Sequence, residues 1–481
     1  MSTISPPLVV DLDGTLTPTD TLVESVLVAI KQSPLNLLRM PFWLLKGRAS
    51  FKEEIATRAQ LAIDRLPYRE PFLQYLIEEK AKGRQLVLAT AAHQRIANRV
   101  SSHLGLFDKV IATKGRCNLK GLEKLSAILE EVGDAFVYAG DSVADVPIWT
   151  AARGAVLVGA SSRTAAMIRG TVPIEREFPN DQPGAPTWMR ALRVHQWVKN
   201  LLLFVPILTA YSFYNLASLK DVLLAFAAFS LAASATYLVN DLWDLESDRI
   251  HPRKRQRPFA SGKLKILHGL AAASVTLVAA LMLASAVSPE FFLVLLAYLA
   301  LTSAYSWLLK EQVILDVLIL SILYTLRIIA GAVAVDVVLT SWLLAFSVFI
   351  FLSLALVKRC AELVSLQDSG GVAARGRDYR VSDLAVLWPL GVGAALSAVV
   401  VFGLFINAPE TRDRYTAPSL LWLVALGLIY WLARLWIKTS RGEMHDDPVI
   451  YAAKDPGSRI VILCILAAML AARFVRIETV L

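Results

Sequence analysis

The sequence predicts an N-terminal α/β domain, with a Rossmann-like sheet and a small helical cap, followed by an all-α membrane domain of nine transmembrane helices. Three observations lead to this. The chain has 481 residues, which is long for one domain. Hydrophobic residues make up 56% of it and the mean hydropathy is +0.53, too apolar for a soluble protein of this size. Residues 1–190 resemble an ordinary soluble domain in composition, whereas residues 198–478 carry most of the long apolar runs.

Charge and cysteine content narrow the function classes. The formal net charge is +9, but most of the excess lies in loops between apolar segments. Positive-inside topology and anionic ligands explain this better than nucleic-acid binding, which is not expected. Cys117, Cys360 and Cys464 are far apart and match neither a metal-site spacing nor a disulfide framework. A reducing, cytoplasmic setting is therefore expected for the soluble part, and Met1–Val10 has no features of a cleaved signal peptide.

Three apolar strands in the first half end in polar residues. They are predicted at Leu8–Val10, Gln85–Ala89 and Ala135–Ala139, with helical stretches between them. Strands alternating with helices indicate a parallel sheet, and such sheets bind ligands beyond the carboxyl ends of their strands. The residues at these ends are Asp11, Asp13, Thr90, Asp141 and Asp145.

In this order, the blocks Asp-x-Asp-Gly-Thr and Gly-Asp-Ser-x-x-Asp resemble the haloacid dehalogenase-like phosphatase superfamily over roughly residues 6–165. The resemblance implies that Asp11 is the nucleophile, which forms an aspartyl-phosphate, and that Asp13 is the general acid/base. A carboxylate can attack phosphorus once a metal and a lysine screen the phosphate charge.

The same resemblance implies further roles. Thr90 would bind the phosphoryl group and Lys124 would neutralise its charge, with Lys120 as the alternative lysine. The cofactor would be Mg²⁺. Its implied ligands are Asp11, the carbonyl of Asp13, Asp141 and Asp145.

The domain boundaries follow from composition. The phosphatase-like domain is expected at residues 1–170, a Pro/Gly-rich linker at 171–187 and a transmembrane domain at 188–481. The cap is expected at about residues 19–67. Its segment Leu37–Lys46 is more apolar than a cap in free solution needs, so it either touches the membrane or second domain or packs within the cap.

Nine apolar segments are each near the ~20 residues that cross a bilayer. Their approximate bounds are 199–217, 222–241, 266–288, 290–308, 312–334, 341–357, 384–406, 418–437 and 459–476. The loops Arg249–Lys265, Lys358–Arg380 and Lys438–Arg459 are rich in Lys and Arg, which predicts that they are cytoplasmic. The N-terminal domain with its site, and the acidic residues that precede Arg249, are then expected on the cytoplasmic face of the cell membrane.

An acidic motif follows the second of these segments. Asp241, Asp244 and Asp248 fall on one face if the helix continues, and Asn240 lies on nearly the same stripe. Carboxylates this close repel one another at the edge of a low-dielectric slab, and a divalent cation removes the conflict. Oxygen ligands of this kind suit Mg²⁺. The basic residues that follow suit phosphate oxygens; they are Arg253, Lys254, Arg255 and Arg257.

Nine spans with Asn-Asp-x-x-Asp-x-x-x-Asp after the second resemble the UbiA-like intramembrane prenyltransferase superfamily over about residues 188–478. Arg193-x-x-Gln-Trp-Val-Lys199-Asn200 and the run Asn240–Gly262 look like the decaprenyl-phosphate phosphoribosyltransferases. Enzymes of that kind move phosphoribosyl from phosphoribosyl pyrophosphate (PRPP) to a polyprenyl phosphate. The resemblance implies that Lys199 and Asn200 contact substrate.

Further residues are expected near the substrates. Tyr305 and Lys310 follow the fourth span, and Asp316 stands alone where the superfamily has a second acidic motif. Arg327 lies deep in the fifth span, where a bare charge costs about 2.5–3.5 kcal/mol. It is therefore either a phosphate ligand or the ion-pair partner of Asp316. Aromatic residues of the sixth segment, Trp342 and Phe346 among them, either line a prenyl channel or pack the helices.

The predicted function is Mg²⁺-dependent transfer of phosphoribosyl from PRPP to a polyprenyl phosphate, with the fused phosphatase removing the 5-phosphate of the product. One alternative is prenyl transfer from a prenyl diphosphate to an aromatic or other acceptor, with an independent phosphatase. A different class is a lipid transporter or membrane scaffold that uses the acidic motif structurally. The expected partners are PRPP, the lipid and the membrane, and the sequence fixes no oligomeric state.

Overall fold

The structure, a computed structural model, describes residues 5–115, 118–179, 183–372, 377–444 and 447–475. Contacts between Cα atoms divide the chain into two compact units. The first unit comprises residues 1–192 and 237–273, and the second comprises residues 193–236 and 274–481. Helices α11 (Leu216–Trp243) and α13 (Ile266–Val287) each contribute residues to both units.

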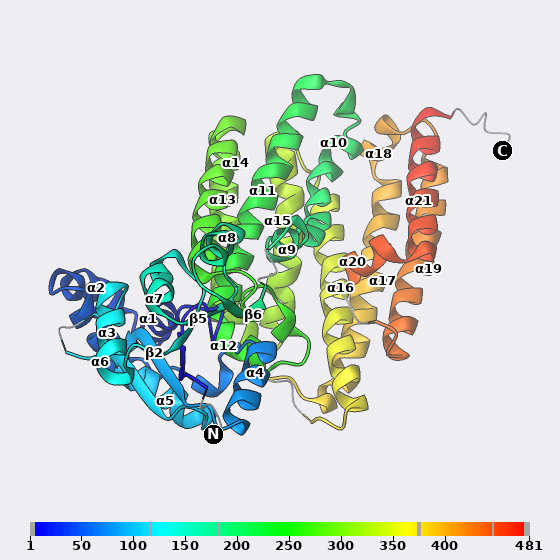
Figure 1. The fold of residues 1–481 in the computed structure, drawn as a ribbon. Coiled ribbons are helices and arrows are strands. Elements are labelled where there is room, and N and C mark those ends of the chain that lie inside the picture. Colours follow the sequence, from blue (N-terminus) through cyan, green and yellow to red (C-terminus); the bar gives the residue numbers. More distant parts are fainter. Residues whose placement is uncertain (1–4, 116–117, 180–182, 373–376, 445–446, 476–481) are drawn as a thin grey trace. The chain divides into compact units, whose positions relative to one another are not determined.

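A six-stranded parallel sheet forms the centre of the first unit, in the order β3-β2-β1-β4-β5-β6 (Figure 1). Side chains of a strand alternate between two faces, and here Leu8 and Val10 join one buried cluster while Val9 joins another. The sheet is therefore covered on both faces, as the predicted Rossmann-like α/β fold requires. The strands are β1 (Leu8–Val10), β2 (Leu86–His93), β3 (Lys109–Thr113), β4 (Val137–Gly140), β5 (Gly154–Val158) and β6 (Ile174–Phe178).

Three helices between β1 and α4 form the cap. The first begins at Asp20, whose carboxylate accepts hydrogen bonds from the amides of Leu22 at 2.9 Å and Val23 at 3.2 Å. Apolar residues on their inner sides, such as Met40 and Trp43, join the cluster on one face of the sheet. The helices of this region are α1 (Thr21–Gln32), α2 (Leu35–Leu45), α3 (Arg48–Arg58), α4 (Glu70–Ala81), α5 (Gln94–Leu104), α6 (Leu122–Val132), α7 (Val146–Ala151), α8 (Ser162–Arg169) and α9 (Ala185–Ala191).

The sheet extends into the segment expected to be a linker. Strand β6 pairs in parallel with β5, for example Val158 with Phe178, and it lies within residues 171–187. The Pro/Gly-rich composition of that segment predicted a linker and gave no sign of a short edge strand. The strand forms because Pro173 and Pro179 lie just outside it and do not interrupt it.

Eight helices within the described residues are long and apolar enough to cross a membrane. They are α11 (Leu216–Trp243), α13 (Ile266–Val287), α14 (Pro289–Trp307), α15 (Leu315–Ala334), α16 (Ser341–Asp368), α17 (Leu384–Asn407), α19 (Leu421–Ser440) and α21 (Pro456–Phe474). These match eight of the nine predicted segments. The all-α membrane domain is confirmed.

Nine spans are not confirmed, because residues 199–217 form no single long helix. They contribute to the 3₁₀ helix η3 (Val194–Phe204), α10 (Val205–Thr209) and η4 (Ser212–Tyr214). Pro206 has no amide hydrogen to donate within a continuing helix, and Tyr211 adopts a left-handed φ of 56° that ends the helical path. An apolar run of the right length thus breaks into short turns.

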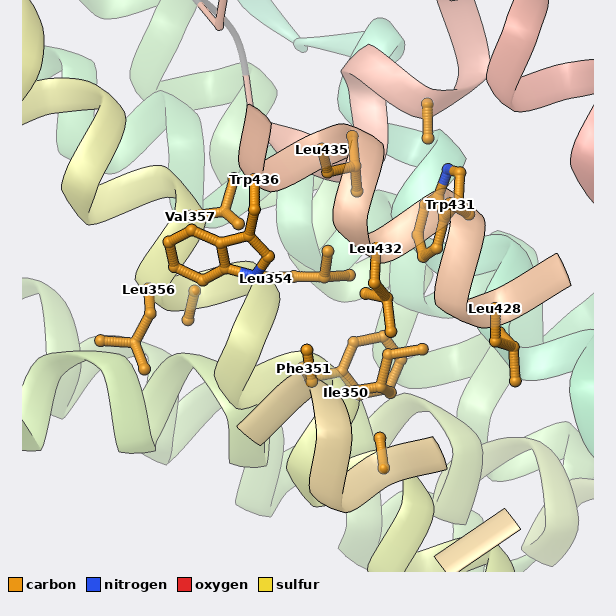
Figure 2. Packing of buried hydrophobic residues seen from close by; sticks show 14 of the residues in the cluster. Ile350, Phe351, Leu354, Leu356, Val357, Leu428, Trp431, Leu432, Leu435 and Trp436 are labelled. Carbon is orange, nitrogen blue, oxygen red and sulfur yellow. The ribbon is translucent and has the colours of Figure 1, made fainter. Parts of the chain in front are cut away.

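One apolar core of the second unit lies around α16 and α19 (Figure 2). Buried residues of the two helices interlock, among them Phe351 and Leu354 from α16 and Leu432 and Trp436 from α19. The indole nitrogen of Trp436 donates to the hydroxyl of Ser353 at 3.1 Å, and that hydroxyl donates to the carbonyl of Gly391 in α17 at 2.9 Å. A polar chain therefore joins three apolar helices, where unpaired polar groups are costly.

The close packing at Gly391 yields a prediction. A β-carbon added there would collide with the six-membered ring of Trp436, whereas one added at Gly393 would meet nothing within 4 Å. Gly391→Leu is expected to cost about 1–3 kcal/mol through overpacking and to lower the melting temperature of the detergent-purified protein. Gly393→Leu, two residues along the same helix, is the matched control. Equal melting temperatures for the two variants would contradict this account of the packing.

Candidate active sites

The first site lies at the carboxyl edge of the sheet. Asp11 follows β1, and Asp141 and Asp145 follow β4, the strand next to it. One carboxylate oxygen from each lies within 4.8 Å of the others. Gly14, at φ +85°, packs against Asp141 so closely that a β-carbon would collide with that carboxylate. The turn after β1 therefore needs glycine both for its backbone conformation and for this close approach.

A buried lysine offsets part of the negative charge of this acidic cluster. Lys124, on α6, is 3% exposed, and its Nζ lies 3.1 Å from Oδ2 of Asp11 and 3.2 Å from Oδ1 of Asp145. It also donates to the hydroxyl of Tyr138 at 2.8 Å. Lys120, the alternative lysine, is exposed. Tyr138 was missed by the sequence reasoning, because it lies inside an apolar strand and carries no motif.

Asp13 and Thr90 lie around the same edge. Oδ1 of Asp13 accepts the backbone amide of Thr21 at 2.8 Å, which ties the acid to the first residue of cap helix α1. Thr90 is buried, and its hydroxyl accepts the amide of Ala92 at 3.0 Å. The cap adds Lys52, another residue missed from sequence, whose Nζ donates to the carbonyl of Ala91 at 2.5 Å.

Burial disfavours the charged form of these acids. It raises the pKa of Asp11 to about 6, although Lys124 acts against the rise. Burial, together with the charge of Asp20, raises the pKa of Asp13 to about 8. Burial also raises the pKa of Asp141 to about 7, helped by the neighbouring acids. Asp11, Asp141 and Asp145 therefore offer three carboxylate oxygens, and the single charge of Lys124 does not balance them. Such a set fits a hard divalent cation such as Mg²⁺, which these three residues would hold.

The acidic motif of the membrane half forms an interrupted helix. Helix α11 ends at Trp243, and α12 (Leu245–Ile250) begins after Asp244. The amide of Asp244 donates to the carbonyl of Asn240 at 2.8 Å, and the amide of Asp248 donates to the carbonyl of Asp244 at 2.9 Å. These two bonds keep helical spacing across the break.

Arg257 bridges two of the motif's carboxylates. Asp241 and Asp248 are both buried, and Nη1 of Arg257 lies 3.1 Å from the first and 2.6 Å from the second. Among the described residues, Asp11, Asp141 and Asp145 are the set that brings three carboxylates within ligand distance, so the predicted metal set at this motif remains a prediction.

The other basic residues of the predicted phosphate block are exposed. Lys254 and Arg255 lie in the 3₁₀ helix η5 (Lys254–Gln256), and Arg253 immediately precedes it. Arg255 also lines a cavity of about 880 Å³ in the first unit, together with Arg190 and Lys263. The block therefore divides into one bridging guanidinium and three exposed cations.

The second unit contains a buried polar cluster around Arg327 of α15. Nε of Arg327 donates to the side-chain oxygen of Asn200 at 2.9 Å, and Nη2 donates to the hydroxyl of Tyr298 at 3.0 Å. Asn200, 1% exposed, donates in turn to Ser230 at 3.1 Å. The structure thus brings together Asn200 and Arg327, which are far apart in sequence.

Asp447 is a second acidic centre that the sequence reasoning missed. Nζ of Lys199 lies 2.7 Å and Nζ of Lys358 lies 3.6 Å from its Oδ2. The hydroxyl of Tyr324 donates to its Oδ1 at 3.1 Å. Burial raises the pKa of Asp447, but these lysines outweigh it and lower the pKa to about 2. Asp447 lies in a polar loop, where an acidic residue gives no signal by itself.

Asp316 pairs with Arg359 rather than with Arg327. Both side chains are fully buried, and the hydroxyl of Tyr379 donates to Asp316 at 2.5 Å. Arg359 also pairs with Glu362. The hypothesis of an Asp316–Arg327 ion pair is therefore wrong, because a guanidinium one helix away already satisfies the carboxylate.

Two predicted substrate residues and the aromatic residues lie elsewhere in the second unit. Tyr305, in α14, and Lys310, in the 3₁₀ helix η6 (Leu309–Glu311), are half-buried. Within the described ranges no hydrogen bond joins either to the Arg327 cluster. Trp342 and Phe346 line an apolar cavity of about 300 Å³, with Phe402 beside them.

The buried pair of Asp316 and Arg359 makes a prediction about stability. Asp316→Ala removes a buried anion that balances the charge of the Arg359 guanidinium, at an expected cost of about 3–5 kcal/mol in the free energy of unfolding. The melting temperature of the purified protein should fall, and Asp316→Ala combined with Arg359→Met should recover much of the loss. A double variant no more stable than Asp316→Ala would contradict the coupling.

Comparison with known proteins agrees with both halves. Residues 201–451 match the UbiA prenyltransferase family, and residues 8–149 match haloacid dehalogenase-like hydrolases. The chain is 39% identical over 476 residues to the uncharacterized protein y4nM of Sinorhizobium fredii, covering 98% of this chain and 90% of that one. It is 36% identical over 277 residues to nodulation protein NoeC of Azorhizobium caulinodans, covering 58% of this chain and 90% of that one.

A third relative carries an enzyme name. The chain is 33% identical over 286 residues to the decaprenyl-phosphate phosphoribosyltransferase of Mycolicibacterium smegmatis, covering 57% of this chain and 88% of that one. The match to y4nM runs through both halves, so the two-domain arrangement is shared with that protein. The chain belongs to the UbiA prenyltransferase family, as a multi-pass membrane protein that carries a haloacid dehalogenase-like domain at its N-terminus.

Proposed function

We propose that the membrane half transfers 5-phosphoribosyl from PRPP to a polyprenyl phosphate, and that the N-terminal domain removes the 5-phosphate from the lipid product. Both reactions would take place at the cytoplasmic face, where the basic loops are predicted. A relative that this chain covers over 88% of its length is named decaprenyl-phosphate phosphoribosyltransferase, which supports the transfer step.

The observation that carries the proposal is the buried guanidinium of Arg327. It is 7% exposed, and among the described residues its hydrogen-bond partners are an amide oxygen, a hydroxyl and a backbone carbonyl, with no carboxylate. The guanidinium also lies over the rings of Tyr298 and Tyr324, which carry no formal charge. A buried cation needs an anionic partner, and here Asp316 is already paired with Arg359. A phosphate of the substrate would supply that charge.

In the proposed transfer, the bond between C1 of the ribose and the pyrophosphate oxygen breaks, and its electron pair leaves with pyrophosphate. A phosphate oxygen of the lipid forms the new bond to C1. Asn240, Asp241, Asp244 and Asp248 would hold the Mg²⁺–pyrophosphate group, while Lys199, Asn200 and Arg327 would bind phosphate. Bound Mg²⁺ would screen the phosphate oxygens and stabilise the leaving group. The protein residues contribute positioning and charge neutralisation.

In the proposed hydrolysis, a carboxylate oxygen of Asp11 attacks the phosphorus, and the sugar oxygen leaves with a proton from Asp13. Burial and the charge of Asp20 raise the pKa of Asp13, which favours the protonated form that a general acid requires. Water then cleaves the aspartyl-phosphate, with Asp13 accepting the proton. Lys124 neutralises the transferring group from its position beside Asp11.

Prenyl transfer from a prenyl diphosphate to an aromatic acceptor is the second candidate. It uses the same acidic motif, and the family match supports it equally. The two candidates differ in the source of the pyrophosphate, which is the sugar in one and the lipid in the other. A substrate test therefore separates them directly.

Asp244 provides that test. The full-length protein, incubated with Mg²⁺, ¹⁴C-labelled PRPP and a polyprenyl phosphate, is expected to move label into the organic phase. Asp244→Asn is expected to lose at least about 100-fold of the rate, on the order of 3 kcal/mol of transition-state stabilisation. Glu246→Gln, two residues along, is the control and should retain activity. Activity on a prenyl diphosphate and an aromatic acid instead of PRPP would overturn the proposal.

Lys124 and Lys120 allow a matched test of the phosphatase. Lys124→Met is expected to reduce hydrolysis of p-nitrophenyl phosphate by at least about 100-fold, because it removes the charge beside the nucleophile. Lys120→Met, on the exposed turn before α6, should change the rate less than about threefold. Equal losses in the two variants would show that the buried lysine is not the group that neutralises the substrate.

A further inference from the structure

Helix α2 of the cap exposes most of its large apolar side chains. Its buried residues are Asn36, Met40 and Trp43, which face the rest of the cap. The side-chain amide of Asn36 even donates to the carbonyl of Ala29 at 2.8 Å. Six large apolar side chains of this 11-residue helix are instead 52–84% exposed: Leu35, Leu37, Leu38, Phe42, Leu44 and Leu45. Single exposed leucines are ordinary, but a contiguous patch marks an interaction surface.

The charges around α2 are all of one sign. Residues 31–52 contain five basic side chains and no acidic one. Arg39, Lys46 and Arg48 are exposed, and no ion pair occupies any of them within the described residues. An apolar helix face flanked by exposed cations matches the surface of a bilayer that contains anionic lipid.

The residues just before α2 contact the end of α11, a helix long and apolar enough to span a membrane. Within the first unit, Nζ of Lys31 lies 5.8 Å from the ring centroid of Trp243, the last residue of α11. Glu24 of α1 forms a bidentate ion pair with Arg249 of α12, at 2.6 and 2.8 Å. Leu35, the first residue of α2, is four residues after Lys31, so the Cα atoms of the two lie at most about 14 Å apart. Tryptophan at a helix end is typical of the membrane interface.

We propose that α2 lies in the cytoplasmic-side interface of the bilayer, with its exposed leucines and Phe42 among the acyl chains and its cations at anionic headgroups. The cap is drawn at the edge of the first unit, where α2 is free of other helices on its outer side (Figure 1). Lipid is chosen over a protein partner because this chain is already a multi-pass membrane protein and because the cations complement anionic headgroups.

An anchored cap has a consequence for the phosphatase. A cap that lies in the interface holds the first site next to the surface where a phosphorylated lipid is found, so the domain would act on lipid-borne phosphomonoesters. This consequence rests on the proposed function. The position of α2 does not, and it is tested below without any substrate.

The test measures the depth of α2 in the membrane. Full-length protein carrying Cys117→Ser and Cys464→Ser is labelled with bimane at Leu38→Cys or Leu45→Cys and placed in nanodiscs that contain phosphatidylglycerol and a lipid with a doxyl group near the headgroup. Met167→Cys on α8, where the native side chain is 48% exposed, is the control. Quenching at the two α2 sites is expected to exceed that at position 167 by at least twofold.

Two results would overturn the proposal. Quenching at Leu38→Cys and Leu45→Cys no greater than at Met167→Cys would show that α2 does not reach lipid. Disulfide crosslinking between two copies through Leu38→Cys, with weak quenching, would assign the apolar face to self-association. As a check on charge, Arg39→Gln combined with Lys46→Gln should reduce quenching at position 38, and unchanged quenching would contradict the role given to anionic lipid.

Discussion

Both halves of the chain depend on a basic side chain that holds buried carboxylates together. In the first site the ammonium of Lys124 lies between Asp11 and Asp145, and in the membrane motif the guanidinium of Arg257 lies between Asp241 and Asp248. Carboxylates at these positions would otherwise repel each other with little solvent to screen them. The surrounding fold brings each cation to its place: α6 carries the lysine to the sheet edge, and the turn after η5 carries the arginine back to α12.

The cap connects these two acidic centres through the first unit. Asp13 accepts the amide of Thr21 at the start of α1, and three residues later Glu24 pairs with Arg249 in the helix that follows Asp244. A single helix of 12 residues therefore contacts Asp13, the proposed general acid, and α12, the helix that follows Asp244. Gly262 packs closely against Pro18 at the same place. In a relative that shares both halves, the two domains are likewise carried on one chain.

The sequence predicted the parts of the fold that depend on periodicity and composition. Buried parallel strands and long apolar helices are recognised from their runs of apolar residues, and the acidic blocks at the strand ends locate one site. The break in the helical path at Pro206 and Tyr211 was missed, because the apolar content of residues 199–217 predicted one continuous membrane-spanning helix. Asp447 and Tyr138 were missed for a different reason. The role of each depends on contacts with lysines far away in the sequence, Lys199 for Asp447 and Lys124 for Tyr138, and a single sequence carries no record of such contacts.

The fate of the 5-phosphate tests the central claim most directly. PRPP labelled with ³²P at the 5-position is supplied with a polyprenyl phosphate and Mg²⁺ to the wild-type protein and to Asp11→Asn. The account predicts free labelled phosphate and an unlabelled ribosyl lipid from the wild type, and a labelled lipid that accumulates in the variant. A lipid product that keeps its label equally in both proteins would contradict it.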